Sequence, residues 1–124
     1  MTGPRFGRSG GAEPQSQPVE LRGVAHRFGA LEAINRIEAE VGAGEVIGLV
    51  GPSGCGKSTL LELVAGLARP TAGTIRIGDL ATEPDRLSRC AYMPQRDLLL
   101  PWLTALDNAA LAPRNRGASR EAAR

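Results

Sequence analysis

Residues 45–61 read EVIGLVGPSGCGKSTLL, and this stretch decides the fold. Its first six residues, 45–50, form an apolar run broken by a single glycine, which is typical of a strand buried on both faces of a parallel sheet. Residues 51–58 match the pattern G-x-x-x-x-G-K-(S/T). From Ser58 to Leu67, leucine and valine recur at helical spacing. The sequence therefore predicts a strand, a glycine-rich loop and a helix in direct succession.

Each part of this loop suits the binding of a phosphate chain. Its glycines allow backbone conformations closed to other residues and leave room for phosphates against the amides. Those amides converge at the predicted helix N-terminus, whose partial positive charge favours an anion. Lys57, the one lysine of the chain, adds a mobile charge that can reach the β- and γ-phosphates, and the Ser58 hydroxyl suits Mg²⁺. The alternative is a glycine-rich turn that binds nothing. The predicted nucleotide-binding residues are Gly51, Pro52, Ser53, Gly54, Cys55, Gly56, Lys57, Ser58 and Thr59.

Composition narrows the class of protein. The chain has 124 residues, a formal net charge of +2 and 42% hydrophobic residues, which suits one soluble domain or a piece of one. The near-balanced charge argues against a dedicated nucleic-acid binder. No apolar run approaches the roughly 18 residues of a membrane span, and no apolar segment follows the first arginines as in a secretory signal. Cys55 and Cys90 fit neither a disulfide framework nor a metal site, so we expect a cytoplasmic chain.

The remaining segments predict the organisation of the chain. Residues 1–18 are rich in Gly, Pro, Ser and Gln, which predicts a disordered tail. Pro70 is expected to block continuation of the helix after the loop, and glycines at 42–44 predict a turn. Thr104 is a candidate cap for a second helix that ends at Pro113. Further strands are expected at residues 19–24, 37–41, 74–77 and 89–93.

Several segments resemble the ATP-binding subunit of ABC transporters. Residues 45–61 resemble its Walker A region, residues 65–67 and 70–75 continue in that family's manner, and Tyr92-Met93-Pro94-Gln95-Arg96 resembles its Q-loop. Residues 98–108 resemble the importers of nitrate, sulfonate, taurine and pyrimidine precursors. The resemblance implies an α/β fold: a P-loop NTPase core with an N-terminal antiparallel β subdomain, truncated at the start of the helical subdomain. It would place a partial ATP-binding domain at 19–113 and a frayed or incomplete helical segment at 114–124.

The resemblance also implies roles for individual residues. Phe28 falls where a family aromatic stacks on adenine, Gln95 would touch Mg²⁺ or its water and relay the nucleotide state, and Leu98 to Leu103 would dock on a transmembrane partner. Lys57 and Gln95 would be the catalytic residues, and Ser58 and Gln95 the metal ligands. The alternatives are a core phenylalanine, a solvated glutamine and a packed corner of the core. His26 receives no role.

The sequence contains no Leu-Ser-Gly-Gly signature, Walker B aspartate, adjoining catalytic glutamate or switch histidine. We therefore expect weak MgATP binding and negligible turnover, because phosphoryl transfer depends on such positioning groups. The expected function is part of an ABC importer's ATP-binding subunit, which couples ATP to uptake of a small organic solute. Its expected partners are a permease, a second copy and, indirectly, a periplasmic or lipid-anchored solute-binding protein, with the chain peripheral on the inner face of the membrane. A non-hydrolysing remnant and another P-loop NTPase or kinase remain alternatives.

Overall fold

The computed structural model describes residues 15–96, 98–119 and 121–123. The chain forms two compact units, Met1–Tyr92 and Met93–Arg124, and each is described by itself. Most of the tail predicted at 1–18 lies outside the described residues, and residues 15–18 are neither helix nor strand. In the part of the chain that the structure describes, no helix is both long and apolar enough to cross a membrane.

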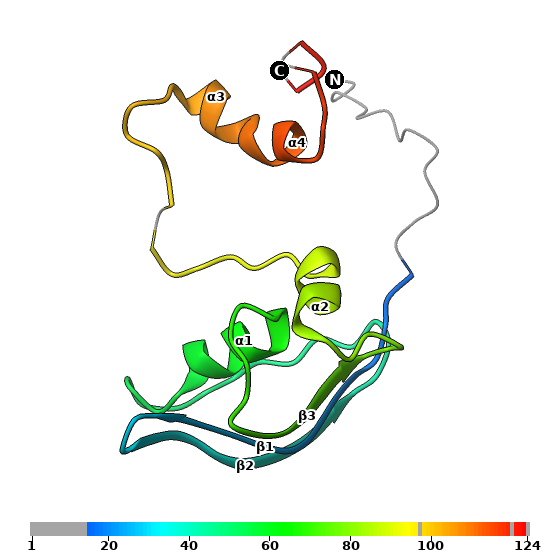
Figure 1. The fold of residues 1–124 in the computed structure, drawn as a ribbon, viewed down its shortest axis with the longest axis vertical. Coiled ribbons are helices and arrows are strands. Elements are labelled where there is room, and N and C mark those ends of the chain that lie inside the picture. Colours follow the sequence, from blue (N-terminus) through cyan, green and yellow to red (C-terminus); the bar gives the residue numbers. More distant parts are fainter. Residues whose placement is uncertain (1–14, 97, 120, 124) are drawn as a thin grey trace, which may run out of the picture. The chain divides into compact units, whose positions relative to one another are not determined.

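The first unit is built on an antiparallel sheet of three strands (Figure 1). Its strands are β1 (Val19–Phe28), β2 (Leu31–Val41) and β3 (Ala72–Ile77), in the order β2-β1-β3. A two-residue turn joins β1 to β2, and Gly29 there has a φ of 58°, which favours glycine. The strands predicted at 19–24, 37–41 and 74–77 are confirmed, and the hairpin extends well beyond the predicted limits.

The hydrophobic core lies between this sheet and helix α1 (Lys57–Ala65). Helices α1 and α2 (Glu83–Arg89) lie over the same face of the sheet (Figure 1). The helical spacing of the leucines after the loop is confirmed, because it turns one side of α1 to the sheet. The buried core residues are Leu21, Val24, Ile34, Leu63 and Ile75.

Helix α1 ends earlier than Pro70 would require. Gly66 adopts a left-handed conformation with a φ of 80°, and its N–H donates to Leu63 O at 3.2 Å. The N–H of Leu67 donates to Glu62 O at 2.9 Å. This glycine C-cap satisfies the last carbonyls of the helix, so the helix stops at Ala65.

The buried strand predicted at 45–50 is wrong for this structure. The segment forms no strand, and the side chains of Val46 and Val50 are each 94% exposed. A strand buried on both faces needs hydrogen-bonded neighbours and cover on each side, and no strand of the described residues pairs with it. The apolar run is therefore extended and open.

The strand predicted at 89–93 is also wrong. Residues 83–89 form α2, and residues 90–94 are extended without a partner strand among the described residues. Thr82 is the N-cap of this helix, and its Oγ1 accepts from the N–H of Asp85 at 3.4 Å. A proline lies in the first turn, where it is favoured. Thr82 and Asp85, three residues apart, were a signal for this helix that the apolar pattern of 89–93 obscured.

The second unit contains α3 (Ala105–Ala109) and α4 (Leu111–Asn115). The predicted cap at Thr104 is confirmed, since its Oγ1 accepts from the N–H of Asp107 at 3.1 Å. Pro113 lies inside α4 rather than after the helix. Because a proline has no N–H and its ring crowds the carbonyl four residues earlier, it explains why α3 ends at Ala109. The frayed segment predicted at 114–124 stays a prediction.

Candidate nucleotide-binding site

The glycine-rich loop is exposed over residues 51–55 and closes around the side chain of Lys57. The Nζ atom of Lys57 donates to Gly51 O at 2.7 Å and to Pro52 O at 2.6 Å. The same ammonium group lies 3.4 Å from Cys55 Sγ. All three N–H bonds of the ammonium can therefore be used within the loop, which holds its charge at the point where phosphates are expected.

The loop leads directly into the N-terminus of α1. Gly56 is the N-cap in a left-handed conformation, and no side chain caps the helix. The first intrahelical bond runs from Leu60 N to Gly56 O at 2.9 Å, so the amides of Lys57, Ser58 and Thr59 precede the ladder. Free amides and the dipole at a helix N-terminus favour an anion, as the predicted phosphate site requires.

Gly56 also fixes the loop against the sheet. A Cβ at this position would lie 2.6 Å from Ala33 O and 2.8 Å from Ile34 Cδ1, both on β2. The close approach requires a residue without a side chain, and the φ of 95° requires glycine as well. The second glycine of the pattern, Gly56, thus joins the loop to the sheet.

The residues present fit Mg²⁺ that arrives with nucleotide phosphates. The Ser58 hydroxyl is exposed on the first turn of α1, next to Lys57. A Cβ on Gly51 would lie 2.9 Å from Cys55 Sγ, so glycine there leaves room for the thiol of Cys55 within the loop. Mg²⁺ in such sites takes few protein ligands and uses the phosphates and water for the rest.

Phe28 lies at the end of β1 and is 55% exposed. Its ring meets His26 edge-to-face, with ring centroids 4.7 Å apart and an interplanar angle of 83°. The interpretation of Phe28 as a core residue is therefore wrong, and its ring is available for stacking. That it stacks on adenine stays a prediction.

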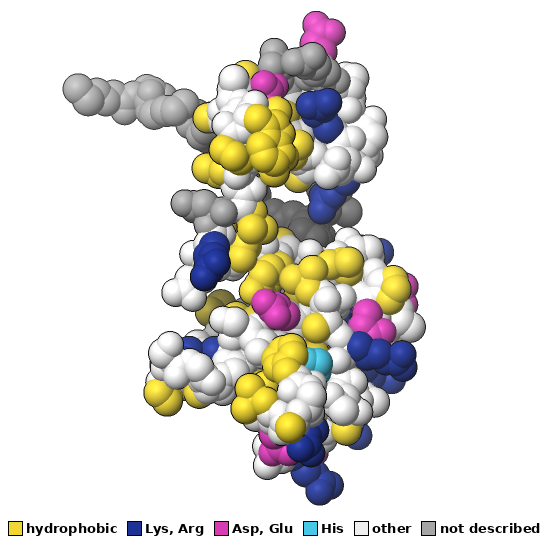
Figure 2. Space-filling model, turned by 60° about the vertical axis from the view of Figure 1, so that its left-hand side comes forward, with side chains coloured by type: hydrophobic (Ala, Val, Ile, Leu, Met, Phe, Trp, Pro, Cys, Tyr) yellow, Lys and Arg dark blue, Asp and Glu magenta, His cyan; other side chains and the backbone are white. Residues whose placement is uncertain are grey.

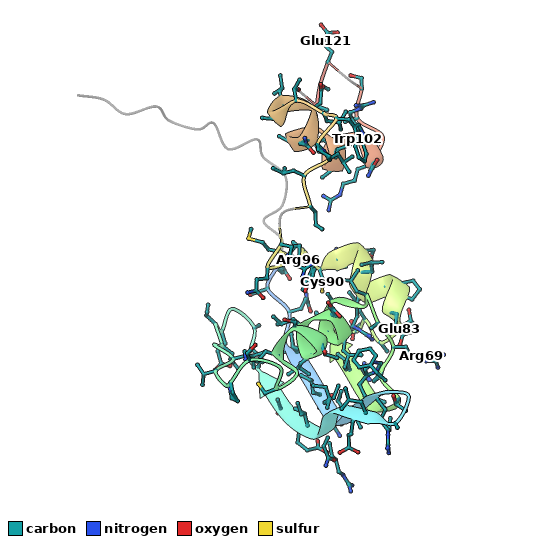
Figure 3. The ribbon with its side chains drawn as sticks, turned by 90° about the vertical axis from the view of Figure 1, so that its left-hand side faces the viewer. Arg69, Glu83, Cys90, Arg96, Trp102 and Glu121 are labelled. Carbon is teal, nitrogen blue, oxygen red and sulfur yellow. The ribbon has the colours of Figure 1, made fainter. Side chains whose placement is uncertain are left out.

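Gln95 and residues 98–103 belong to the second unit and are described with it. Gln95 is exposed, as are Leu98 (73%), Leu99 (67%) and Trp102 (75%). Figure 2 shows hydrophobic side chains on the surface of this unit, and Figure 3 labels Trp102 on the turn before α3. The interpretation of these three apolar residues as a packed corner of the core is wrong.

Asn108 shapes this apolar turn and was missed by the sequence analysis. Its Oδ1 accepts from Leu100 N at 2.8 Å, and its Nδ2 donates to Leu100 O at 3.1 Å. Nδ2 also lies within 3.3 Å of Leu103 O and 3.1 Å of Thr104 O. One amide thereby holds the turn from Leu100 to Thr104, which presents Trp102 to solvent.

Arg86 on α2 was also missed. It is 1% exposed and donates to carbonyls at the C-terminal end of α1, on β3 and in the turn before α2. A guanidinium at a helix C-terminus stabilises the helix dipole, so Arg86 holds α1, and with it the loop, against β3. Its acceptors are Leu63 O (3.3 Å), Val64 O (3.3 Å), Ile75 O (3.2 Å) and Ala81 O (2.5 Å).

A groove of about 890 Å³ lies along β3, away from the glycine-rich loop. It contains two ion pairs, Arg22 with Glu20 and Arg69 Nε at 4.0 Å from Glu83 Oε1 (Figure 3), and none of its lining residues belongs to the loop. The groove therefore adds no residue to the candidate site.

The sequence profile of ABC transporters matches residues 34–124, which is most of the chain and includes the whole loop. The chain belongs to the ABC transporter family. This confirms the resemblance drawn from the Walker A and Q-loop segments. It also confirms the fold class, because the solved structures that match are ATP-binding cassettes.

Curated relatives of this ABC transporter chain include import proteins. It is 44% identical over 109 residues to the aliphatic sulfonates import ATP-binding protein SsuB 2 of Pseudomonas aeruginosa, covering 86% of this chain and 39% of the relative. It is 40% identical over 98 residues to the taurine import ATP-binding protein TauB of Burkholderia pseudomallei, covering 79% and 37%. The importer subgroup expected from residues 98–108 is thus found among its relatives.

A matching solved structure is a dimer of the ATP-binding cassette MJ0796 in a post-hydrolysis state, bound to ADP and Pi. The TM-score is 0.72 at 32% identity, and the match covers 85% of this chain and 52% of that one. The chain spans about a third of the length of the curated relatives it matches, from 28% to 39%.

Proposed function

We propose that this chain forms the nucleotide-binding part of the ATP-binding subunit of an ABC importer for a small organic solute. The observation that carries the proposal is the Lys57 ammonium held over a glycine loop at an uncapped helix N-terminus. The names of the sulfonate and taurine relatives support import and the class of solute.

In this proposal the phosphates of ATP replace the loop carbonyls as partners of Lys57. The ammonium donates to Gly51 O and Pro52 O, and a phosphate oxygen is a stronger acceptor for a cation than a neutral carbonyl. The amides of the first turn of α1 take the remaining phosphate oxygens, since no side chain competes for them. Binding of ATP therefore replaces hydrogen bonds from the ammonium to neutral carbonyls by hydrogen bonds to charged phosphate oxygens. It creates no new buried charge.

The assignments of metal, coupling and partners belong to the same proposal. Ser58 and Gln95 would hold Mg²⁺, which neutralises phosphate charge when bound. The exposed turn from Leu98 to Leu103 would dock on a permease at the inner face of the membrane, and a second cassette would complete the site. The dimeric ABC cassette MJ0796 supports the second copy.

Titration of MgATP into the purified protein tests the proposal. We expect weak binding, in about the millimolar range, and a loss of about 10-fold or more in Lys57→Ala, because a charge-assisted hydrogen bond is removed. Arg69→Ala is the matched control, since Arg69 is an exposed cation outside the loop. Equal binding by the wild type and Lys57→Ala would refute the proposal, as would no binding at all.

Turnover is tested separately by a steady-state ATPase assay. We expect negligible hydrolysis by residues 1–124 on their own, because these residues contain no Walker B or switch-histidine group to position the attacking water. Robust hydrolysis that disappears in Lys57→Ala would show that this expectation is wrong while leaving nucleotide binding intact.

A further inference from the structure

His26 and Phe28 form an aromatic pair on one face of β1. Residues two apart on a strand point to the same side, and here the two rings meet at 83° with centroids 4.7 Å apart. Phe28 is 55% exposed, so one side of its ring is packed by histidine while much of the rest is open. An edge-to-face contact of this kind favours one angle between the two rings and so restrains the ring of Phe28.

The pair is connected to the glycine-rich loop through β2. His26 is the register partner of Ile34, and Phe28 is the partner of Leu31 next to the hairpin turn. Ile34 and Ala33 are the residues that approach Gly56, where a Cβ would lie 2.6 Å from Ala33 O. The strand that carries the pair is therefore hydrogen-bonded to the strand that seats the phosphate loop.

The packing of His26 is not explained by its own hydrogen bonds. Its Nδ1 atom is buried, and no partner for it exists among the described residues. A buried ring nitrogen without a partner destabilises the fold, and an apolar ring of similar size would avoid that cost. The aromatic contact of His26 is with the Phe28 ring. Figure 2 shows the histidine beside hydrophobic side chains at the surface.

We propose that His26 is a positioning residue for nucleotide-base recognition: its ring packs against the Phe28 ring and restrains it, so that the exposed part of Phe28 is ready to stack on the base. The proposal rests on the proposed function, because it requires Phe28 to meet the base of a nucleotide bound in the loop. A ring already restrained loses less freedom when the base binds, so the benefit is to affinity for the base rather than for the phosphates.

Two ligands distinguish the contribution of the base to binding from that of the phosphates. Isothermal titration of the purified protein with Mg-ATP and with Mg-tripolyphosphate, which has no base, gives the ratio of the tripolyphosphate dissociation constant to the ATP dissociation constant. The variants are His26→Leu, which keeps most of the bulk but removes the aromatic ring, His26→Phe, which restores an aromatic ring, and Phe28→Leu. Arg27→Ala is the matched control, because Arg27 lies between the two rings in sequence while its guanidinium contacts Ala30 O and Glu32.

We expect His26→Leu to weaken ATP binding about 3- to 10-fold and to leave tripolyphosphate binding unchanged, which lowers the ratio. His26→Phe should restore the ratio, and Phe28→Leu should lower it at least as much as His26→Leu. Circular dichroism and denaturation midpoints show whether each variant folds, and the ratio is unaffected by a general loss of folded protein.

Different failures overturn different claims. If Phe28→Leu lowers the ratio and His26→Leu does not, the role of His26 is refuted while the base site stands. If neither variant changes the ratio, both the role of His26 and the assignment of Phe28 are refuted. If the wild type binds neither ligand, the proposed function falls and the role of His26 falls with it.

Discussion

Gly56 joins two requirements in one residue: the N-cap conformation of α1 and the contact of the loop with β2. Gly54, two residues earlier, has a similar φ of 79°, but a Cβ there would meet nothing within 4 Å. A side chain at Gly54 would cause backbone strain alone, whereas a side chain at Gly56 would cause backbone strain and a steric clash. Comparing the two substitutions therefore isolates the effect of the clash.

We predict that Gly56→Ala destabilises the protein by about 2–4 kcal/mol, whereas Gly54→Ala costs about 1 kcal/mol. Both substitutions place a side chain at positive φ, and only the first drives a Cβ into Ala33 O and Ile34 Cδ1. Urea denaturation followed by circular dichroism measures both. Equal losses would show that the contact with β2 does not form in solution.

The thiol of Cys55 is exposed inside the loop, 3.4 Å from the ammonium of Lys57. We predict that alkylation with N-ethylmaleimide lowers nucleotide affinity at least about 10-fold, because the adduct fills space that phosphates need. Cys55→Ala should keep its affinity after the same treatment. Full modification of Cys55 with unchanged binding would contradict the prediction.

We predict that Cys90 reacts with N-ethylmaleimide more slowly than Cys55 and that its modification lowers nucleotide affinity less. Burial raises the pKa of the Cys90 thiol, so a smaller fraction is thiolate at neutral pH, and its reactivity should rise as the pH approaches that pKa. Mass spectrometry of the two peptides over time distinguishes the sites. A faster reaction at Cys90 than at Cys55 at about pH 7 would contradict this order.

At the scale of elements, α2 holds the first unit together through one side chain. Arg86 is 1% exposed and donates to carbonyls of α1, β3 and the turn before α2, so that one side chain joins the three. Its ion pair with Glu83 is long, at 3.9 Å, so the carbonyls provide most of its contacts.

We predict that Arg86→Met lowers the free energy of unfolding by about 2–4 kcal/mol, since several buried carbonyls lose a charged donor. Arg89→Met on the same helix should change it by less than about 0.5 kcal/mol, because Arg89 is exposed. Denaturation of both variants measures the difference. A similar small change in both would mean that solvent replaces the guanidinium.

At the scale of the whole molecule, the chain carries an apolar segment that its own described residues leave uncovered. Val46 and Val50 are 94% exposed, and Ile47 and Leu49 are 49% and 42% exposed. An extended, unpaired run of β-branched and apolar residues favours association with other chains.

We predict that the double variant Val46→Lys and Val50→Lys self-associates less than the wild type and keeps its stability within about 0.5 kcal/mol. Ile75→Lys is the contrasting variant, because Ile75 is 2% exposed in the core and the charge would unfold the unit. Sedimentation velocity and denaturation measure the two properties. A double variant as unstable as Ile75→Lys would show that the segment is buried in solution.

The sequence alone was sufficient to predict where the loop, α1, the hairpin strands and the Thr104 cap occur, because each depends on residues a few positions apart. These signals are glycine spacing, helical periodicity, strand alternation and a capping side chain. Each of them involves residues that are close together in the sequence. The family followed from the same local motifs.

Only the tertiary structure showed the features that depend on residues distant in the sequence. The run at 45–50 has the composition of a buried strand, yet burial requires neighbouring strands, and the described residues provide none. Likewise, nothing near Arg86 in the sequence shows that carbonyls from α1 and β3 converge on it, and nothing near Gly56 shows that β2 approaches it. Local pattern fixes what a segment can become, and the partners that meet it in space decide whether the segment is buried, paired or left open.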